Sequence, residues 1–219
     1  MAPRGILFDF NGVIVDDERH HCAALIATLA EHGIALTEAD YYRHYLGYDD
    51  RGCFAHAWRE SGRTLTGSTL QLLVQRKAER YAELIRGSLT LVPGAEAFIR
   101  AATGEGLLLG IVSGALRREI ELVLDVAGLH GAFGPIVAAE DVAACKPDPE
   151  GYRRGLAALA LPAADVVVIE DSLPGLAAAR ATGLACQLLA TSHPAAELRD
   201  RAPVWDDLSG HHPRELPWS

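Results

Sequence analysis

The stretch Gly5-Ile-Leu-Phe-Asp-Phe-Asn-Gly12 is an apolar run that ends in an acidic residue and an Asn-Gly pair. A short, continuously apolar run followed by turn-forming residues is typical of a buried strand that enters a tight turn. Similar apolar runs follow at residues 107–112, 135–138, 166–169 and 185–189. Because these runs are apolar throughout rather than alternating, they favour a parallel sheet that is covered on both faces.

Helical patterns lie between the apolar runs, at residues 94–102, 116–127, 150–159 and 173–182. This alternation predicts an α/β fold, a doubly wound parallel sheet of the Rossmann-like type. Residues 17–90 break the alternation, because they contain helix-like segments at 20–32, 38–45, 53–60 and 70–85 and no convincing strand. We therefore predict an α/β core of residues 1–16 and 91–219, interrupted by an inserted all-helical domain of residues 17–90. The end of the chain, residues 209–219, is rich in Pro and His, which predicts a loosely held tail.

The composition excludes several classes of protein. The chain has 219 residues, and its 20 Lys and Arg against 29 Asp and Glu give a formal net charge of −9. With 49% hydrophobic residues it is too apolar for a disordered chain, and its acidic balance argues against binding duplex nucleic acid. The apolar run at residues 5–10 is too short for a signal peptide or a membrane span. We expect a cytoplasmic monomer with no membrane or nucleic-acid partner.

The cysteines are spaced too widely for a paired zinc site or a redox motif. They are Cys22, Cys53, Cys145 and Cys186. We therefore expect free thiols, most of them buried, with Cys145 close to any site that includes Lys146.

Polar residues follow the predicted strands at the points where these end. Asp9 follows the first strand, Ser113 the second, and Glu170 with Asp171 the fourth, while Lys146 lies in a loop. Ligands of open parallel sheets bind beyond the carboxyl ends of the strands, so we expect these side chains to converge there. Carboxylates without clustered His or Cys suit a hard cation such as Mg²⁺, and a lysine beside them would offset charge on a phosphoryl group.

These residues resemble the motifs of a known family. Asp9-Phe-Asn-Gly-Val-Ile-Val15, Ser113, Lys146-Pro-Asp-Pro149 and Ile169-Glu-Asp-Ser-Leu-Pro-Gly175 together resemble the four motifs of the haloacid dehalogenase-like superfamily, in its branch of phosphatases and beta-phosphoglucomutases. The order and spacing match over almost the whole chain, and the family places a helical cap directly after the first motif. The resemblance implies a Mg²⁺-dependent phosphohydrolase that acts on a small phosphorylated metabolite, such as a sugar phosphate, through an aspartyl-phosphate.

The resemblance also implies a role for each matching residue. Asp9 would be the nucleophile and a metal ligand, Ser113 would hydrogen-bond the phosphoryl group, and Lys146 would stabilise it. The further metal ligands would be the backbone carbonyl of Asn11 and the side chains of Glu170 and Asp171. Gly114 would lie beside the substrate.

Three residues of the predicted cap resemble positions that approach the substrate in the mutase branch. They are His21, Lys77 and Arg51, although Arg51 stands one position away from the arginine that grips a second phosphate there. Lys77 could equally lie on a solvated helix face without contacting substrate. His21 could equally be a histidine that only packs against its neighbours.

Asn11 departs from the family pattern, which has a second aspartate at this position. That aspartate protonates the leaving group and later deprotonates the attacking water, and an amide cannot exchange a proton in this way. Four explanations remain open: a substrate with a good leaving group, a relocated acid–base residue with His21 as first choice, a weak or non-catalytic member, or an engineered replacement.

Two other functions compete with the phosphohydrolase. A phosphosugar mutase would use Lys77 and Arg51 for a second phosphate, and a non-catalytic protein would keep the metal and phosphate site but not the turnover. A haloalkanoate dehalogenase is disfavoured, because that branch needs no Mg²⁺ whereas Glu170 and Asp171 are retained here.

Overall fold

The computed structural model describes residues 4–45 and 48–218 and divides into two compact units. One unit, called the core unit below, comprises the residues up to Asp16 and those from Thr90 onward. The other, the helical unit, comprises Asp17–Leu89. Residues 1–3 and 219, the two ends of the predicted core, lie outside the described residues, as do residues 46–47.

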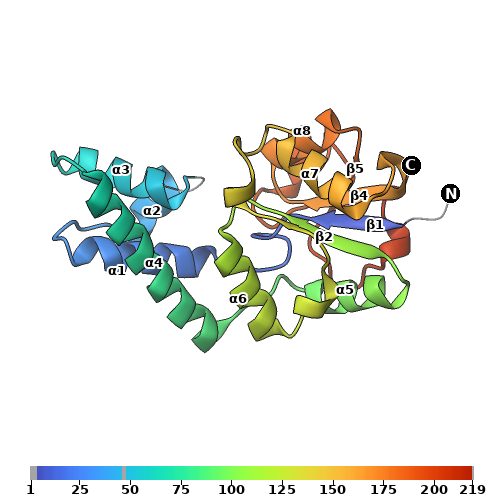
Figure 1. Ribbon diagram of the computed structural model, residues 1–219, viewed down its shortest axis with the longest axis horizontal. Coiled ribbons are helices and arrows are strands. Elements are labelled where there is room, and N and C mark those ends of the chain that lie inside the picture. The colour runs from blue at the N-terminus through green and yellow to red at the C-terminus, as the bar shows by residue number, and fades with distance from the viewer. Residues whose placement is uncertain (1–3, 46–47, 219) are drawn as a thin grey trace. The chain divides into compact units, whose positions relative to one another are not determined.

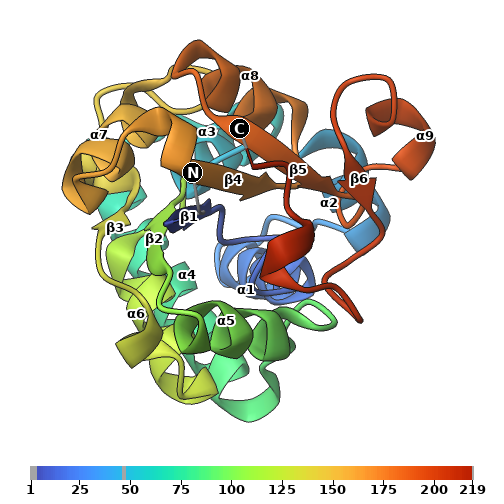
Figure 2. The ribbon, with the colours of Figure 1, turned by 90° about the vertical axis from the view of Figure 1, so that its right-hand side faces the viewer.

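A six-stranded parallel sheet forms the centre of the core unit (Figure 2). Its strands lie side by side in the order β3-β2-β1-β4-β5-β6. The chain thus moves outward from β1 in one direction and then, from β4, in the other, so the sheet is doubly wound and the predicted fold class is confirmed. The strands are β1 (Gly5–Phe8), β2 (Leu108–Val112), β3 (Ile136–Val137), β4 (Val166–Glu170), β5 (Ala185–Leu189) and β6 (Val204–Trp205).

Helices cover both faces of this sheet. Helices α7 and α8 pack on one side, and α5 and α6 lie on the opposite side (Figure 1). This double cover explains why β1 and β4 are buried along their whole length and read as continuous apolar runs. The helices of the core unit are α5 (Ala95–Gly104), α6 (Arg117–Ala127), α7 (Glu150–Leu159), α8 (Leu173–Ala181) and α9 (Ala195–Leu198), with short 3₁₀ turns at His130–Ala132, Ala139–Asp141, Ala163–Asp165 and Pro213–Glu215.

The C-terminal part of the core unit differs from the expectation in two ways. The edge strand β6 was not predicted, because two residues are too few to form a recognisable pattern. The expectation of a loosely held tail was wrong: Leu216 is buried, and the indole of Trp218 donates a hydrogen bond to the carbonyl of Pro213 at 3.0 Å. The 3₁₀ turn at Pro213–Glu215 packs on α5.

The helical unit has its own hydrophobic core. Its helices are α1 (Glu18–Ala30), α2 (Glu38–His44), α3 (Asp50–Glu60) and α4 (Gly67–Ser88), and α4 packs across α1 (Figure 1). Thr37, Asp49 and Thr66 cap α2, α3 and α4 by accepting a backbone N–H at the first turn. Leu25, Phe54 and Leu73 are among the buried side chains between the helices. Within the described residues, none of the helices combines the length and apolar character needed to cross a membrane.

Phe8 is the large side chain that closes the core beneath the carboxyl end of β1. It is fully buried, and its ring meets Phe98 and Phe133 edge to face, with centroids 6.4 Å and 5.7 Å away. Aromatic pairs in this arrangement add to the burial of apolar surface.

We expect Phe8→Ala to lower the free energy of unfolding by about 3–5 kcal/mol, because it leaves a cavity between β1 and the side chains of Phe98 and Phe133. Leu108→Ala on the neighbouring strand is the matched control, since Leu108 is 48% exposed, and should change stability by less than about 1 kcal/mol. Urea denaturation of the three proteins measures both values. Equal losses in the two variants would contradict this account of the core.

Candidate active site

The register of the sheet places the first candidate residues side by side. Phe8 pairs with Ile169 across β1 and β4, and the amide of Asp9 donates a hydrogen bond to the carbonyl of Ile169 at 2.9 Å. Asp9 therefore emerges from β1 beside Glu170, the last residue of β4. Because β1 and β4 are where the strand order reverses, this edge of the sheet is the position at which doubly wound folds bind ligands.

Three carboxylates meet at this edge. Each of Asp9, Glu170 and Asp171 offers an oxygen atom that lies within 4.8 Å of those of the other two. Glu170 and Asp171 are buried, and Asp9 is mostly so. Like charges held this close and out of water repel one another strongly, so the cluster needs positive charge.

Lys146 supplies one positive charge to the cluster. Its Nζ lies 2.8 Å from Oδ1 of Asp9 and 2.6 Å from Oε1 of Glu170. Burial alone would lower the pKa of the lysine, but Asp9 and Glu170 raise it above its ordinary value, so the side chain stays an ammonium. One lysine does not balance three carboxylates.

The titration of the acids reflects this imbalance. Burial raises the pKa of Asp9 to about 7, and repulsion from Glu170 and Asp171 adds to the shift while Lys146 opposes it. Burial and the charge of Glu170 raise the pKa of Asp171 to about 6. For Glu170, burial is outweighed by Lys146 and by hydrogen bonds, so its pKa is lowered.

Glu170 is held by neighbours on both of its oxygens. The hydroxyl of Tyr152 donates to Oε1 at 2.7 Å, and the hydroxyl and amide of Ser172 donate to Oε2 at 2.9 Å and 3.2 Å. Gly175 makes this possible, because a Cβ there would come 1.8 Å from a Glu170 oxygen. The glycine in the first turn of α8 thus leaves the space that the Glu170 carboxylate occupies.

Asp171 is held by the loop that follows β5. The hydroxyl of Ser192 hydrogen-bonds Oδ2 of Asp171, and the hydroxyl of Thr191 donates to the carbonyl of Gly12 at 2.5 Å. Gly12 has a φ of +73°, and a Cβ on it would come 2.0 Å from Oδ2 of Asp171. The loop therefore ties Asp171 to the turn that begins at Asn11.

A divalent cation fits this donor set. All the donors are oxygen atoms, which Mg²⁺ prefers as ligands. A bound Mg²⁺ would also supply the missing positive charge, which the raised pKa values of Asp9 and Asp171 reflect. Asn11 begins a tight turn in which the amide of Gly12 donates to the carbonyl of Val15 at 2.8 Å.

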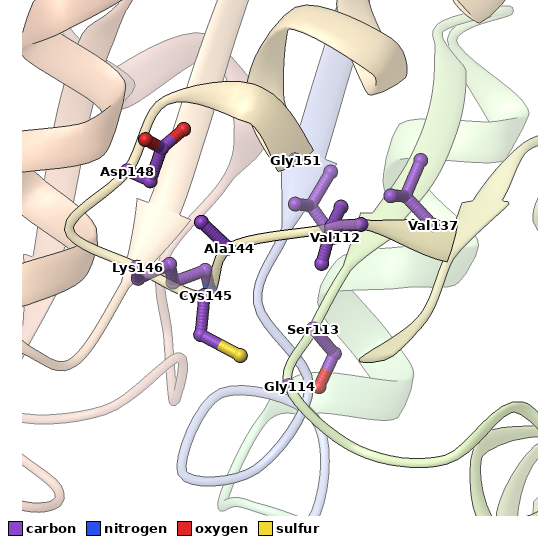
Figure 3. Close-up of a pocket in the computed structure, with 10 residues that line it drawn as sticks. Val112, Ser113, Gly114, Val137, Ala144, Cys145, Lys146, Asp148 and Gly151 are labelled. Atoms are coloured by element: carbon purple, nitrogen blue, oxygen red, sulfur yellow. The ribbon is translucent and has the colours of Figure 1, made fainter. Parts of the chain in front are cut away.

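Lys146, which contacts Asp9 and Glu170, also lines a pocket of about 200 Å³ (Figure 3). Ser113, Gly114 and Lys146 line it, so the structure brings together the residues expected to hold a phosphoryl group. Ser113 is buried and its hydroxyl accepts a hydrogen bond from the amide of Ala115. Cys145 also lines this pocket as an exposed free thiol, and the other three cysteines are free and buried.

Two of the three candidate residues of the helical unit, His21 and Lys77, lie in a second cluster within that unit. Nδ1 of His21 lies 2.5 Å from Nζ of Lys77, and Nε2 of His21 lies 3.2 Å from Oδ2 of Asp17. Nζ of Lys77 also lies 2.5 Å from Oδ1 of Asp50, and the ammonium is buried. The hydroxyl of Tyr81 donates to Asp17, and its ring stacks on His21 at 4.4 Å.

Arg51 is placed differently from His21 and Lys77. It is exposed on the first turn of α3, and it is the preceding residue, Asp50, that contacts Lys77. His21 and Lys77 are thus brought together, while Arg51 is not part of their cluster.

Sequence reasoning missed Tyr152, Ser192 and Asp50. Tyr152 is the third residue of α7, and nothing in the local sequence marks its hydroxyl as a partner of Glu170. Ser192 and Asp50 have no local signal, because their contacts depend on how distant segments fold together.

Comparisons with known proteins found a family model, curated relatives and solved structures that match the chain. The family model of haloacid dehalogenase-like hydrolases matches residues 3–183. Protein CbbY of Rhodobacter capsulatus is 30% identical over 84% of this chain and 84% of its own, and validoxylamine A 7'-phosphate phosphatase of Streptomyces hygroscopicus subsp. limoneus is 26% identical over 93% of each.

Crystal structures of CbbY from Rhodobacter sphaeroides superpose on the chain with a TM-score of 0.87. They cover 98% of this chain and 99% of theirs, at 25% and 26% identity. One contains phosphate, and the other is an aspartate-to-asparagine variant in complex with xylulose-(1,5)bisphosphate.

The raised pKa of Asp171 predicts a pH dependence of stability. In the folded, cation-free protein this carboxyl keeps its proton up to a pH of about 6, whereas in the unfolded chain it releases it near pH 4. The folded state binds more protons over this range, so stability falls as the pH rises through it. Asp171→Asn should remove this loss and gain about 1–3 kcal/mol at pH 7.5 but little at pH 4.

Urea denaturation in EDTA at the two pH values measures the difference. Asp148→Asn, which changes an exposed acid, is the matched control and should show no such dependence. If Asp171→Asn were less stable than the wild type at pH 7.5, the claim that an ionised Asp171 destabilises the cation-free protein would be wrong.

Proposed function

The chain belongs to the haloacid dehalogenase-like hydrolases, and on that premise we propose that it is a Mg²⁺-dependent phosphatase of a small phosphorylated metabolite. The observation that carries the proposal is the convergence of Asp9, Glu170 and Asp171 around Lys146 at the switch point of the sheet. A nucleophilic carboxylate, a fixed ammonium and an oxygen-rich cation site are the parts that phosphoryl transfer to an aspartate requires.

In this proposal Asp9 takes the phosphoryl group as an aspartyl-phosphate, which water then hydrolyses. Lys146 holds Asp9 in position and offsets charge on the phosphoryl oxygens, while Ser113 and Gly114 border the pocket beside it. Covalent transfer divides one difficult displacement into two easier ones.

The proposed metal ligands are the side chains of Asp9, Glu170 and Asp171 and the backbone carbonyl of Asn11. When bound, Mg²⁺ would supply the positive charge that draws phosphoryl oxygens to this acidic site. The ligand taken from Asn11 is a backbone carbonyl, so it does not depend on the side chain at that position.

The relatives support a phosphorylated substrate, because their names and complexes refer to phosphate, xylulose-(1,5)bisphosphate and validoxylamine A 7'-phosphate. We propose that the helical unit acts as the cap and that His21, Lys77 and Arg51 contribute to substrate binding. The ammonium of Lys77 is already paired with Asp50, which offsets the charge that a second phosphate would need. This contact favours hydrolysis of a monophosphate over the mutase alternative.

Asp9→Asn should abolish Mg²⁺-dependent release of phosphate while leaving the fold intact, because the amide cannot accept a phosphoryl group. Release of phosphate from p-nitrophenyl phosphate and from a panel of sugar phosphates measures this, with thermal unfolding as a check on folding. Asp200→Asn, which changes an exposed acid outside the pocket, is the matched control and should retain activity. Activity that persists in Asp9→Asn would rule out the aspartyl-phosphate, and no Mg²⁺-dependent release from the wild type would favour a non-catalytic protein.

Asn11→Asp should raise kcat on alkyl phosphates by about 10²–10⁴-fold, because it restores a group that exchanges protons with the leaving oxygen and with water. Parallel kinetics of the two proteins on glucose 6-phosphate test this. An unchanged kcat would mean that another residue already performs the proton transfers.

A further inference from the structure

The two halves of the proposed reaction need protons at different atoms. In the first, a carboxylate oxygen of Asp9 attacks phosphorus, and the bond from phosphorus to the leaving oxygen breaks with its electron pair. An alkoxide leaving in this way must be protonated, whereas a carboxylate or phenolate leaves as a stable anion. In the second, water attacks phosphorus, the bond to Asp9 breaks, and the water must lose a proton to a base.

The side chain at position 11 cannot serve either half, because an amide neither gives nor takes a proton near neutral pH. The two acids that cluster with Asp9 in the core unit have other partners. Glu170 accepts hydrogen bonds from Lys146, Tyr152 and Ser172, while Asp171 pairs with Ser192.

Two histidines that could act as the base are also engaged with other partners. His193, which follows Ser192, has its Nδ1 3.9 Å from a carboxylate oxygen of Glu197 on α9. In the helical unit, His21 has Asp17 against one ring nitrogen and Lys77 against the other. A histidine in either place must exchange these partners before it can act as a base.

The missing proton exchange therefore affects the two halves unequally. In the first half, a phosphoryl donor whose leaving group is weakly basic needs no general acid to protonate that group. In the second half, water attacks the aspartyl-phosphate whichever phosphoryl donor formed it. The choice of phosphoryl donor therefore cannot replace the general base that this step needs. Loss of general base help slows such a step by about 10²–10⁴-fold.

We propose that this chain accepts phosphoryl groups from acyl phosphates and other donors with weakly basic leaving groups, and that it holds the phosphoryl group on Asp9 as a long-lived aspartyl-phosphate. The inference rests on the proposed function, since it assumes that Asp9 is the nucleophile. It adds the class of donor and the species that accumulates.

Incubation with acetyl phosphate and MgCl₂, followed by intact-mass measurement after removal of the donor, tests the proposal. The wild type should gain the mass of one phosphoryl group, keep it on the time scale of the measurement, and lose it on treatment with neutral hydroxylamine, which cleaves acyl phosphates. Asn11→Asp should release phosphate rapidly and carry little adduct, and Asp9→Asn should carry none. Peptide mapping of the starting protein verifies that Asn11 has not been deamidated to aspartate.

A kinetic experiment provides an independent measurement. With p-nitrophenyl phosphate the wild type should release about one equivalent of nitrophenolate in a burst and then turn over about 10²–10⁴-fold more slowly than Asn11→Asp. Glucose 6-phosphate, whose leaving group is an alkoxide, should give no burst.

The possible outcomes distinguish a failure of the long-lived aspartyl-phosphate from a failure of the proposed phosphatase function. Steady phosphate release by the wild type with no adduct would overturn the long-lived aspartyl-phosphate but leave the phosphatase in place, and would point to a relocated base such as His21. Neither adduct nor release in both the wild type and Asn11→Asp would overturn the proposed function itself.

Discussion

The ion pairs of Lys146 with Asp9 and Glu170 are the interaction around which the core unit is organised. Three carboxylates within 4.8 Å of one another, mostly out of water, are stable only if each has a charge or a hydrogen-bond donor beside it. The structure supplies these donors from segments far apart in the sequence: Lys146 before α7, Tyr152 within it, and Ser192 after β5. The sheet brings them together because every one of them lies near the carboxyl end of a parallel strand.

Sequence reasoning predicted the parts of the fold that have a strong local pattern. The apolar runs at β1 and β4 and the acids that follow them could be read directly, since the runs are short and turn-forming residues follow them. The short β6 and the packed residues around Leu216 could not, because their order comes from contacts with the rest of the core unit. The division at Asp16 and Asp17 was suggested by where the strand pattern stops.

The candidate site was predictable to the same degree. The residues at strand ends, such as Asp9 and Glu170, were found because topology alone places them together. Their supports were missed, because a hydroxyl such as that of Ser192 becomes informative only when its partner in space is known. Lys77 is an intermediate case: the resemblance identified it, but only the folded helical unit places its ammonium between His21 and Asp50.

Ser172 joins the stability of a helix to the chemistry of the site. Its hydroxyl donates to Glu170 and accepts the amide of Gly175, so the same oxygen caps α8 and fixes a carboxylate of the cluster. A substitution of Ser172 therefore changes the cap of α8 and the position of the Glu170 carboxylate at the same time. In a library selected for thermal stability, this position would be constrained by two traits together, so the region around α8 is a poor place to seek independent improvement of either.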